Sequence, residues 1–139
     1  MRTTFSSRRR SRWAWLAVWV LPVLAGCNAS APAPELSPEV LYMYHNNLGP
    51  MCIEMKNWLN ETVIPSYPNL IIEEHLLSDV NALGTLNALT AQYDQSQGPS
   101  SSFQYMPAVF YQGHAYSGFD ESVKSELSSL IEQAQTSSD

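Results

Sequence analysis

Positive charge is scarce beyond the first twelve residues of this chain. The 139 residues include seven Lys and Arg, and five of these are arginines at or before Arg12. After residue 12 only Lys56 and Lys124 remain, against all 13 acidic residues, so this part carries a formal charge of −11. Nucleic acids and anionic lipid surfaces attract proteins through Lys and Arg. The charge balance therefore argues against a nucleic-acid partner and against membrane binding through basic residues.

Cysteine is also rare: the sequence contains only Cys27 and Cys52. Two cysteines exclude the dense disulfide framework of many small secreted domains. His45, His75 and His114 have no Cys or carboxylate at the spacing of metal ligands, so we expect no zinc site. No serine lies in the sequence context of a hydrolase nucleophile. The sequence predicts no metal and no other cofactor.

The N-terminus has the order of a signal sequence. Arginines up to Arg12 precede an apolar run from Trp13 to Leu24, which is shorter than the roughly 20 residues that cross a bilayer. The run ends at Leu-Ala-Gly-Cys27, which resembles the lipobox of bacterial lipoproteins. That resemblance implies cleavage before Cys27 and diacylation of its sulfur. Stable anchoring takes more than one acyl chain.

Residues 1–26 are thus predicted to be a lipoprotein signal peptide. The alternatives are an uncleaved anchor helix, an ordinary secretory signal, or a twin-arginine signal suggested by Arg8–Arg10. Residues 27–38 are small residues and prolines, which predict a flexible tether after the lipidated cysteine. The resemblance implies a protein of the bacterial cell envelope that faces the periplasm. Asn28, where inner-membrane lipoproteins of enterobacteria tend to have Asp, favours the outer membrane.

Residues 39–139 are enough for one domain with one core. Short apolar runs alternate there with stretches of helical spacing. We expect strands at Val40–His45, Leu70–Leu77, Pro107–Tyr111 and Ala115–Ser117, the last two joined by a turn at Gly113-His114. We expect helices from Cys52 to Pro65, from the Ser78-Asp79 cap to Tyr93, and from Asp120 to Ala134. The Ser- and Gln-rich residues 95–102 predict a surface loop.

The order β-α-β-α-β-β-α predicts an α/β fold with a mixed four-stranded sheet flanked by helices. Over residues 40–134 this order resembles the thioredoxin fold. Gly49-Pro50-Met51-Cys52 resembles its active-site turn, and Met106–Phe110 resembles its cis-proline segment. The resemblance implies that Tyr105, Met106 and Pro107 present their backbone to a bound chain. The alternative for Pro107 is a trans proline that opens an edge strand.

The active-site turn departs from the thioredoxin pattern at one position. In that family two cysteines flank two residues at a helix N-terminus: the first attacks a disulfide and the second resolves the mixed disulfide. Counting places Gly49 at the first position and Cys52 at the second. In a competing register Cys52 is the exposed first cysteine of Cys52–Met55, as in monothiol glutaredoxins. His45, just before the turn, is expected at the surface or as a cap, although it could tune the pKa of Cys52.

Two hypotheses for function follow. The first is a membrane-anchored thioredoxin-like protein with a degenerate active site and a redox-associated role through the single thiol of Cys52. Dithiol oxidoreductase activity is not expected, because Gly49 replaces the nucleophile. The second is a non-catalytic module that binds a protein or peptide in the same groove. A third possibility for Cys52 is an inert, buried side chain at a helix start.

Overall fold

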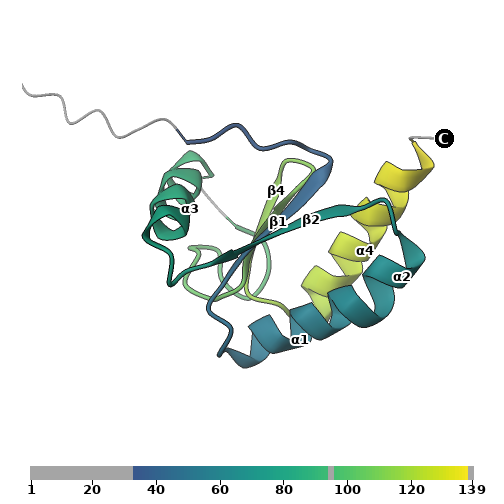
Figure 1. Ribbon diagram of the computed structural model, residues 1–139, viewed down its shortest axis with the longest axis horizontal. Coiled ribbons are helices and arrows are strands. Elements are labelled where there is room, and N and C mark those ends of the chain that lie inside the picture. The colour runs from purple at the N-terminus through teal and green to yellow at the C-terminus, as the bar shows by residue number, and fades with distance from the viewer. Residues whose placement is uncertain (1–32, 94–95, 138–139) are drawn as a thin grey trace, which may run out of the picture.

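The computed structural model describes residues 33–93 and 96–137 (Figure 1). In chain order the elements are β1 (Val40–His45), α1 (Pro50–Trp58), the π-helix η1 (Leu59–Val63), α2 (Ile64–Ser66), β2 (Ile71–Leu76), α3 (Val80–Gln92), β3 (Ala108–Tyr111), β4 (His114–Ser117) and α4 (Glu121–Thr136). The sheet has the strand order β2-β1-β3-β4; β1 is parallel to β2, and the other neighbours are antiparallel. This confirms the predicted α/β architecture, which is consistent with a thioredoxin-like fold.

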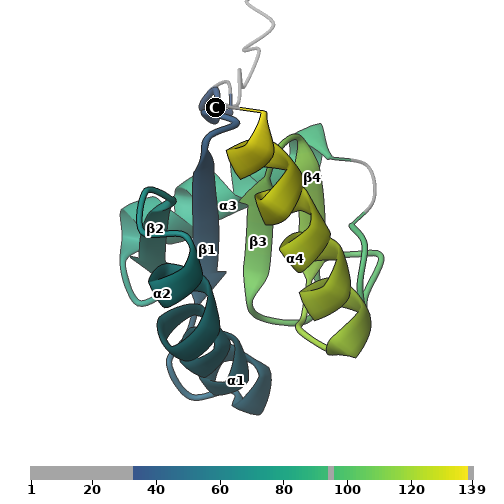
Figure 2. The same ribbon diagram turned by 90° about the vertical axis from the view of Figure 1, so that its right-hand side faces the viewer.

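Helices cover both faces of the sheet. Helices α1 and α4 lie on one face and α3 lies on the other (Figure 2). Alternate residues of β1 serve the two sides: Leu41 and Met43 join the core under α1 and α4, whereas Tyr44 joins the core under α3. Because successive side chains of a strand point to opposite faces, a strand buried on both sides is apolar throughout. This explains the uninterrupted apolar run that predicts β1.

The first helical region runs further than predicted. Pro65 and Pro68 were expected to end it, and the chain stays helical through Pro65 to Ser66, two residues before Pro68. The N–H of Ile64 bonds to the carbonyl of Leu59, five residues back, so the turn before the proline is a π turn. Proline lacks an N–H and its ring crowds the carbonyl four residues earlier. The wider π turn accommodates Pro65 without ending the helix.

The predicted caps and the hairpin are present. The Asp79 carboxylate accepts a hydrogen bond from the N–H of Asn81 at 2.8 Å, and the Asp120 carboxylate accepts one from the N–H of Val123 at 2.9 Å. The hairpin turn lies one residue earlier than predicted, at Gln112 and Gly113, which have φ of 48° and 76°. Two consecutive left-handed residues match the twist of a two-residue β-hairpin.

Residues 96–102 form no helix or strand, but they pack against the domain. The predicted loop is present and most of its described residues are exposed or half-buried, but Ser96 and Ser100 are buried. Gln97 forms an isolated parallel bridge with Tyr116 on the outer edge of β4. The buried serine hydroxyls are satisfied inside the segment, where Ser96 Oγ donates to the carbonyl of Ser100. Composition alone did not reveal this, because the small polar side chains bond to backbone groups that the fold brings close.

The predicted tether includes residues that contact the domain. Ala33 and Leu36 pack against the apolar cluster under α3. The N–H of Ser37 donates to the hydroxyl of Tyr42 at 3.3 Å. Cys27 and the predicted signal peptide lie outside the described residues, so the structure does not bear on them.

Gly118 and Gly84 allow a matched test of where the backbone requires glycine. Gly118 has φ of +86°, and an added Cβ would lie 3.1 Å from Pro99 Cγ and 3.2 Å from Met51 Sδ. Gly84 lies inside α3, and an added Cβ would meet nothing within 4 Å. We expect Gly118→Ala to lower the free energy of unfolding by about 1–2 kcal/mol, the cost of a left-handed conformation.

The control, Gly84→Ala, should raise the same free energy by about 0.5–1 kcal/mol, because alanine loses less backbone entropy in a helix. Urea unfolding followed by circular dichroism measures both changes. A neutral or stabilising Gly118→Ala would contradict the close approach between residue 118 and the start of α1.

Candidate functional site

The segments singled out in the sequence meet at one end of the sheet. Tyr44, near the end of β1, pairs with Ala108, at the start of β3. Ala108 in turn pairs with Ser117, at the end of β4. The chain therefore leaves the sheet after His45, enters it at Pro107 and leaves it again after Ser117 at the same end. The candidate site consists of residues 46–52, 105–107 and 118–119.

Asn46 organises the turn that leads into α1. Its Oδ1 accepts hydrogen bonds from the N–H of Leu48 at 3.1 Å and from the N–H of Gly49 at 3.0 Å. Gly49 is the N-cap of α1 and Pro50 follows as its first residue. Proline suits this position because its missing N–H would have no partner inside the helix. The side chain of Asn46 thus holds the turn before the helix, whereas no side chain among the described residues caps the first turn of α1.

Cys52 lies in the first turn of α1 and is fully buried. Its Sγ lies 3.5 Å from Oδ1 of Asn46, within hydrogen-bonding distance for sulfur. A thiol without solvent contact reacts with an external disulfide only when the local structure opens. The geometry is that of a packed side chain with a weak hydrogen bond.

The position of Gly49 supports the first of the two registers. A Cβ built on Gly49 lies 3.6 Å from Cys52 Sγ. A side chain at position 49 would therefore lie beside the thiol of Cys52, as the first register requires. The competing register requires an exposed Cys52, but this side chain is fully buried.

The peptide bond between Met106 and Pro107 is cis, as the thioredoxin resemblance implied. Pro107 is buried, and its carbonyl accepts a hydrogen bond from the N–H of Gly118 at 2.9 Å. The next residue, Phe119, has its N–H 3.5 Å from Sδ of Met51, inside the active-site-like turn. The corner at residues 118–119 thus contacts both the proline segment and the start of α1.

Backbone groups before the proline differ in how they are satisfied. The hydroxyl of Ser117 bonds to both backbone groups of Tyr105: it accepts from the Tyr105 N–H at 3.1 Å and donates to the Tyr105 carbonyl at 2.9 Å. The N–H and C=O of Met106 make no hydrogen bond with the described residues. The Tyr105 side chain is 49% exposed beside them. An extended chain could therefore pair with the backbone of Met106.

His45 was expected at the surface, and this expectation is wrong. The side chain is only 3% exposed, because α1 and β2 close over the end of β1. Its Nε2 lies 3.2 Å from Glu74 Oε2, which also lies 3.1 Å from Nζ of Lys56. Nδ1 has no hydrogen-bond partner in the described part of the chain.

The pKa of His45 is lowered from its ordinary value. Burial is the largest cause, the positive charge of Lys56 adds to it, and Glu74 opposes both. The neutral imidazole is therefore favoured at pH 7. Sequence reasoning missed this cluster because the parallel pairing of β1 with β2, which brings Glu74 to His45, is a long-range contact.

An apolar groove adjoins Met106 on the α3 side. Its volume is about 420 Å³. It is lined by Leu77, Leu83, Leu86, Asn87, Thr90, Tyr93, Ser102, Phe103 and Met106. Because Met106 lines this groove and also has free backbone groups, a chain paired with Met106 could place a side chain in it.

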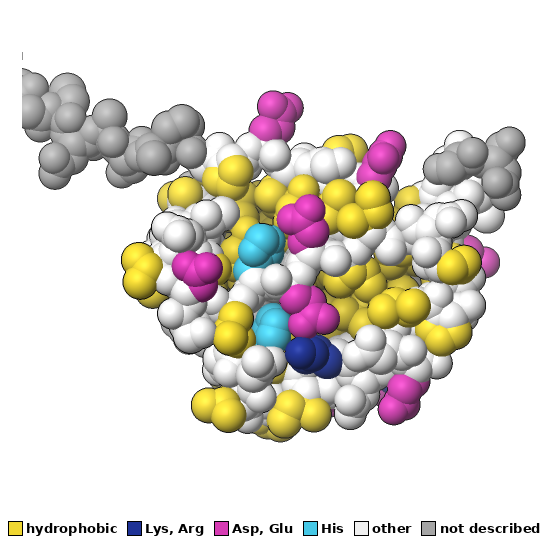
Figure 3. All heavy atoms as spheres, viewed as in Figure 1, with side chains coloured by type: hydrophobic (Ala, Val, Ile, Leu, Met, Phe, Trp, Pro, Cys, Tyr) yellow, Lys and Arg dark blue, Asp and Glu magenta, His cyan; other side chains and the backbone are white. Residues whose placement is uncertain are grey.

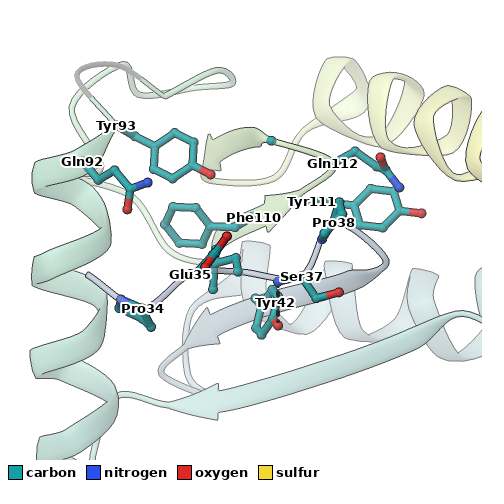
Figure 4. A pocket seen from close by; sticks show the side chains of 12 residues that line it. Pro34, Glu35, Ser37, Pro38, Tyr42, Gln92, Tyr93, Phe110, Tyr111 and Gln112 are labelled. Atoms are coloured by element: carbon teal, nitrogen blue, oxygen red, sulfur yellow. Dashed lines mark hydrogen bonds between the residues drawn. The ribbon is translucent and has the colours of Figure 1, made fainter. Parts of the chain in front are cut away.

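A second hollow lies under residues 34–38 (Figure 4). Its volume is about 190 Å³, below the roughly 300 Å³ at which ligand pockets usually begin. Tyr93 and Phe110 contribute rings whose centroids are 5.3 Å apart, and Glu35 lies over them from the N-terminal segment. The hollow reflects imperfect packing of this segment on the sheet, and we assign it no ligand.

Comparisons with known proteins add no relative: no protein family, curated protein or solved structure matches the chain. Among the described residues, no helix is long and apolar enough to cross a membrane. The same residues contain no group of three or more His, Cys, Asp and Glu side chains that could hold a metal ion. The function must therefore be argued from the site itself.

The distance between positions 49 and 52 can be tested directly. In a Cys27→Ser background, we expect Gly49→Cys to form a disulfide with Cys52 under mild oxidation, because the two positions face each other. Thiol titration and intact mass measure the loss of both thiols. A matched control, Glu121→Cys, places a cysteine on an 83% exposed side chain at the start of α4 and should keep its thiol reduced. Persistence of both thiols in the Gly49→Cys protein would contradict the geometry.

Proposed function

We propose that this protein is a non-catalytic binding module of the bacterial cell envelope that holds an extended segment of a partner protein beside Pro107. The observation that carries the proposal is the backbone of Met106, whose N–H and C=O have no partner among the described residues. Buried backbone polar groups in folded proteins are almost always paired, with other protein groups or with water, and groups without a protein partner are open to another chain. Two unpaired groups beside an exposed tyrosine suit a chain added by backbone hydrogen bonds.

The adjoining groove supports the same function. Leu83 is 46% exposed on its wall, and Tyr105 is 49% exposed at the other side of Met106. Apolar side chains of this kind, exposed around free backbone groups, stabilise a bound chain through burial on association. The partner segment would bond to Met106 and insert an apolar side chain between α3 and Phe103.

The buried thiol favours binding over redox chemistry. A redox role through Cys52 needs the sulfur to reach a second sulfur within bonding distance, about 2.05 Å. Cys52 is fully buried, and Asn46 Oδ1 lies against its sulfur. Gly49 offers no thiol of its own. The redox-associated role therefore takes second place, because its thiol would have to emerge from the first turn of α1 before it could react.

Attachment to the membrane is part of the proposal. The order of charged, apolar and small residues before Cys27 supports a lipid anchor on that sulfur. With residues 1–26 removed, two acyl chains on Cys27 would hold the domain at the periplasmic side of a membrane, with the outer membrane favoured by Asn28. An acidic domain with two lysines has little other means to adhere to anionic lipid.

Photocrosslinking in bacterial cells tests the binding function. A photoreactive phenylalanine analogue at position 105 should capture an envelope protein in a discrete adduct, because Tyr105 borders the free backbone of Met106. The same analogue at Ile64, which is 44% exposed on α2, is the matched control and should give no adduct. Cys52→Ser should leave the adduct unchanged. Loss of the adduct in Cys52→Ser would favour the redox role instead, and equal capture at both positions would reject the binding site.

Lipid attachment has its own test. Cys27→Ser should move the protein from the membrane fraction to the soluble fraction and abolish labelling by radioactive palmitate. Cys52→Ser serves as the control, because it removes the other cysteine and should change neither result. Continued palmitate labelling of Cys27→Ser would contradict the lipobox.

A further inference from the structure

The two edge strands of the sheet, β4 and β2, differ in whether their outer backbone groups have hydrogen-bond partners. On the outer edge of β4, residues of the preceding segment occupy the backbone: the N–H of Gln97 donates to the carbonyl of Ala115 at 2.8 Å, and the N–H of Ser117 donates to the carbonyl of Gln97 at 2.9 Å. Strand β2, at the other edge, has β1 as its neighbour on one side and no described strand on the other. Its outward N–H and C=O groups are therefore open to another chain.

Strand β2 is regular along its whole length, which suits it to pairing with an added strand. All six of its residues pair with β1 in unbroken register, from Ile71 to Leu76, so no bulge turns the edge away. It contains neither proline nor lysine, which commonly block pairing at sheet edges. Ile71 is 53% exposed and Leu76 is 38% exposed at its two ends. Because they are five residues apart, Ile71 lies on the face of Glu73 and Leu76 on the face of Glu74.

The middle of the edge is acidic. Glu73 is 49% exposed and Glu74 is 40% exposed. Figure 3 looks onto this side of the molecule and shows acidic and histidine side chains across its middle, bordered by hydrophobic groups. Lys56 lies against Glu74, whereas Glu73 has no Lys or Arg within ion-pair distance among the described residues. Opposite charges on neighbouring strands stabilise their pairing, and like charges oppose it.

This charge pattern identifies the occupant. Two copies of the chain that paired through β2 about a two-fold axis centred on either glutamate would place Glu73 of one opposite Glu73 of the other, or Glu74 opposite Glu74. The rest of the domain is acidic as well, so a second copy is repelled at short and at long range. A strand in which basic residues alternate with apolar ones, with a basic residue opposite Glu73, has the opposite charge on that face and apolar side chains on the face of Ile72 and Leu76.

We propose that the outer edge of β2 is a second interaction surface, which binds an extended segment of alternating basic and apolar residues by adding it as a fifth strand. The backbone of β2 provides the hydrogen bonds, and Glu73 provides the selection for a basic partner. This surface is separate from the backbone of Met106, because β1 lies between β2 and the strand that Met106 precedes. It does not depend on the function proposed for that groove.

A synthetic peptide of alternating lysine and valine, about as long as β2, tests the proposal. It is titrated into the full chain, which is kept in solution with a mild non-ionic detergent, and amide shifts are followed by nuclear magnetic resonance. We expect saturable shifts in β2 and unchanged amides in β4, with binding that weakens as salt is added because salt screens the charges. A peptide of alternating glutamate and valine should not bind.

Glu73→Lys should weaken binding of the lysine–valine peptide by at least about tenfold, since a close opposite-charge pair becomes a like-charge pair. The matched control is Glu132→Lys, which makes the same change of charge at an exposed position of α4 and should bind like the unmodified protein. Equal weakening in both variants would show a general charge effect and overturn the proposal.

Three further results would overturn it. The first is shifts confined to residues around Met106 and α3, which would assign the peptide to the groove. The second is equal binding of the acidic peptide. The third is line broadening of β2 amides that grows with protein concentration in the absence of peptide, which would identify a second copy of the chain as the occupant.

Discussion

The structure depends on burial of β1 and β3 from both sides. Each of these central strands sends alternate side chains into the core under α1 and α4 and into the core under α3. Full burial of a large apolar side chain contributes about 1.5–3 kcal/mol, so two filled cores fix the strand register firmly. A shift of the strand register by one residue would move the side chains of each core to the opposite face of the sheet. The same register brings the loop after β1, the residue before β3 and the corner after β4 to one end of the sheet, and this convergence creates the candidate site.

Most of the fold could be predicted because its signals are local. Apolar runs predicted β1 and β3, and Asp79 and Asp120 marked helix starts that the structure confirms. The errors concern one long-range contact and one local irregularity of a helix. His45 is buried because β2 and α1 close over it, which residues close in the sequence do not reveal. Pro65 stays within a helix because a π turn precedes it, and the spacing of apolar residues does not distinguish a π turn from an α turn.

The candidate site was predictable in part. The thioredoxin resemblance located Cys52 and the cis bond before Pro107, and the strand register places both at one end of the sheet. The contribution of Asn46 was missed. An asparagine in a loop is common, and only the fold shows that its Oδ1 accepts from two N–H groups and lies against the thiol. The free backbone of Met106 was also beyond sequence reasoning, because every residue but proline carries the same backbone groups.

Some polar groups of the molecule have hydrogen-bond partners within the protein, and others have none among the described residues. At the active-site-like turn, Asn46 accepts from two N–H groups that precede α1 and contacts the sulfur, so Cys52 needs no substrate to satisfy it. At β4, Gln97 satisfies the outer edge. The backbone of Met106 and the outer edge of β2 have no such arrangement among the described residues. An unpaired polar group costs free energy once water is removed, whereas a paired one does not. Groups that stay unpaired and accessible are therefore the places where an added chain gains the most, and they point to binding rather than to chemistry at the thiol.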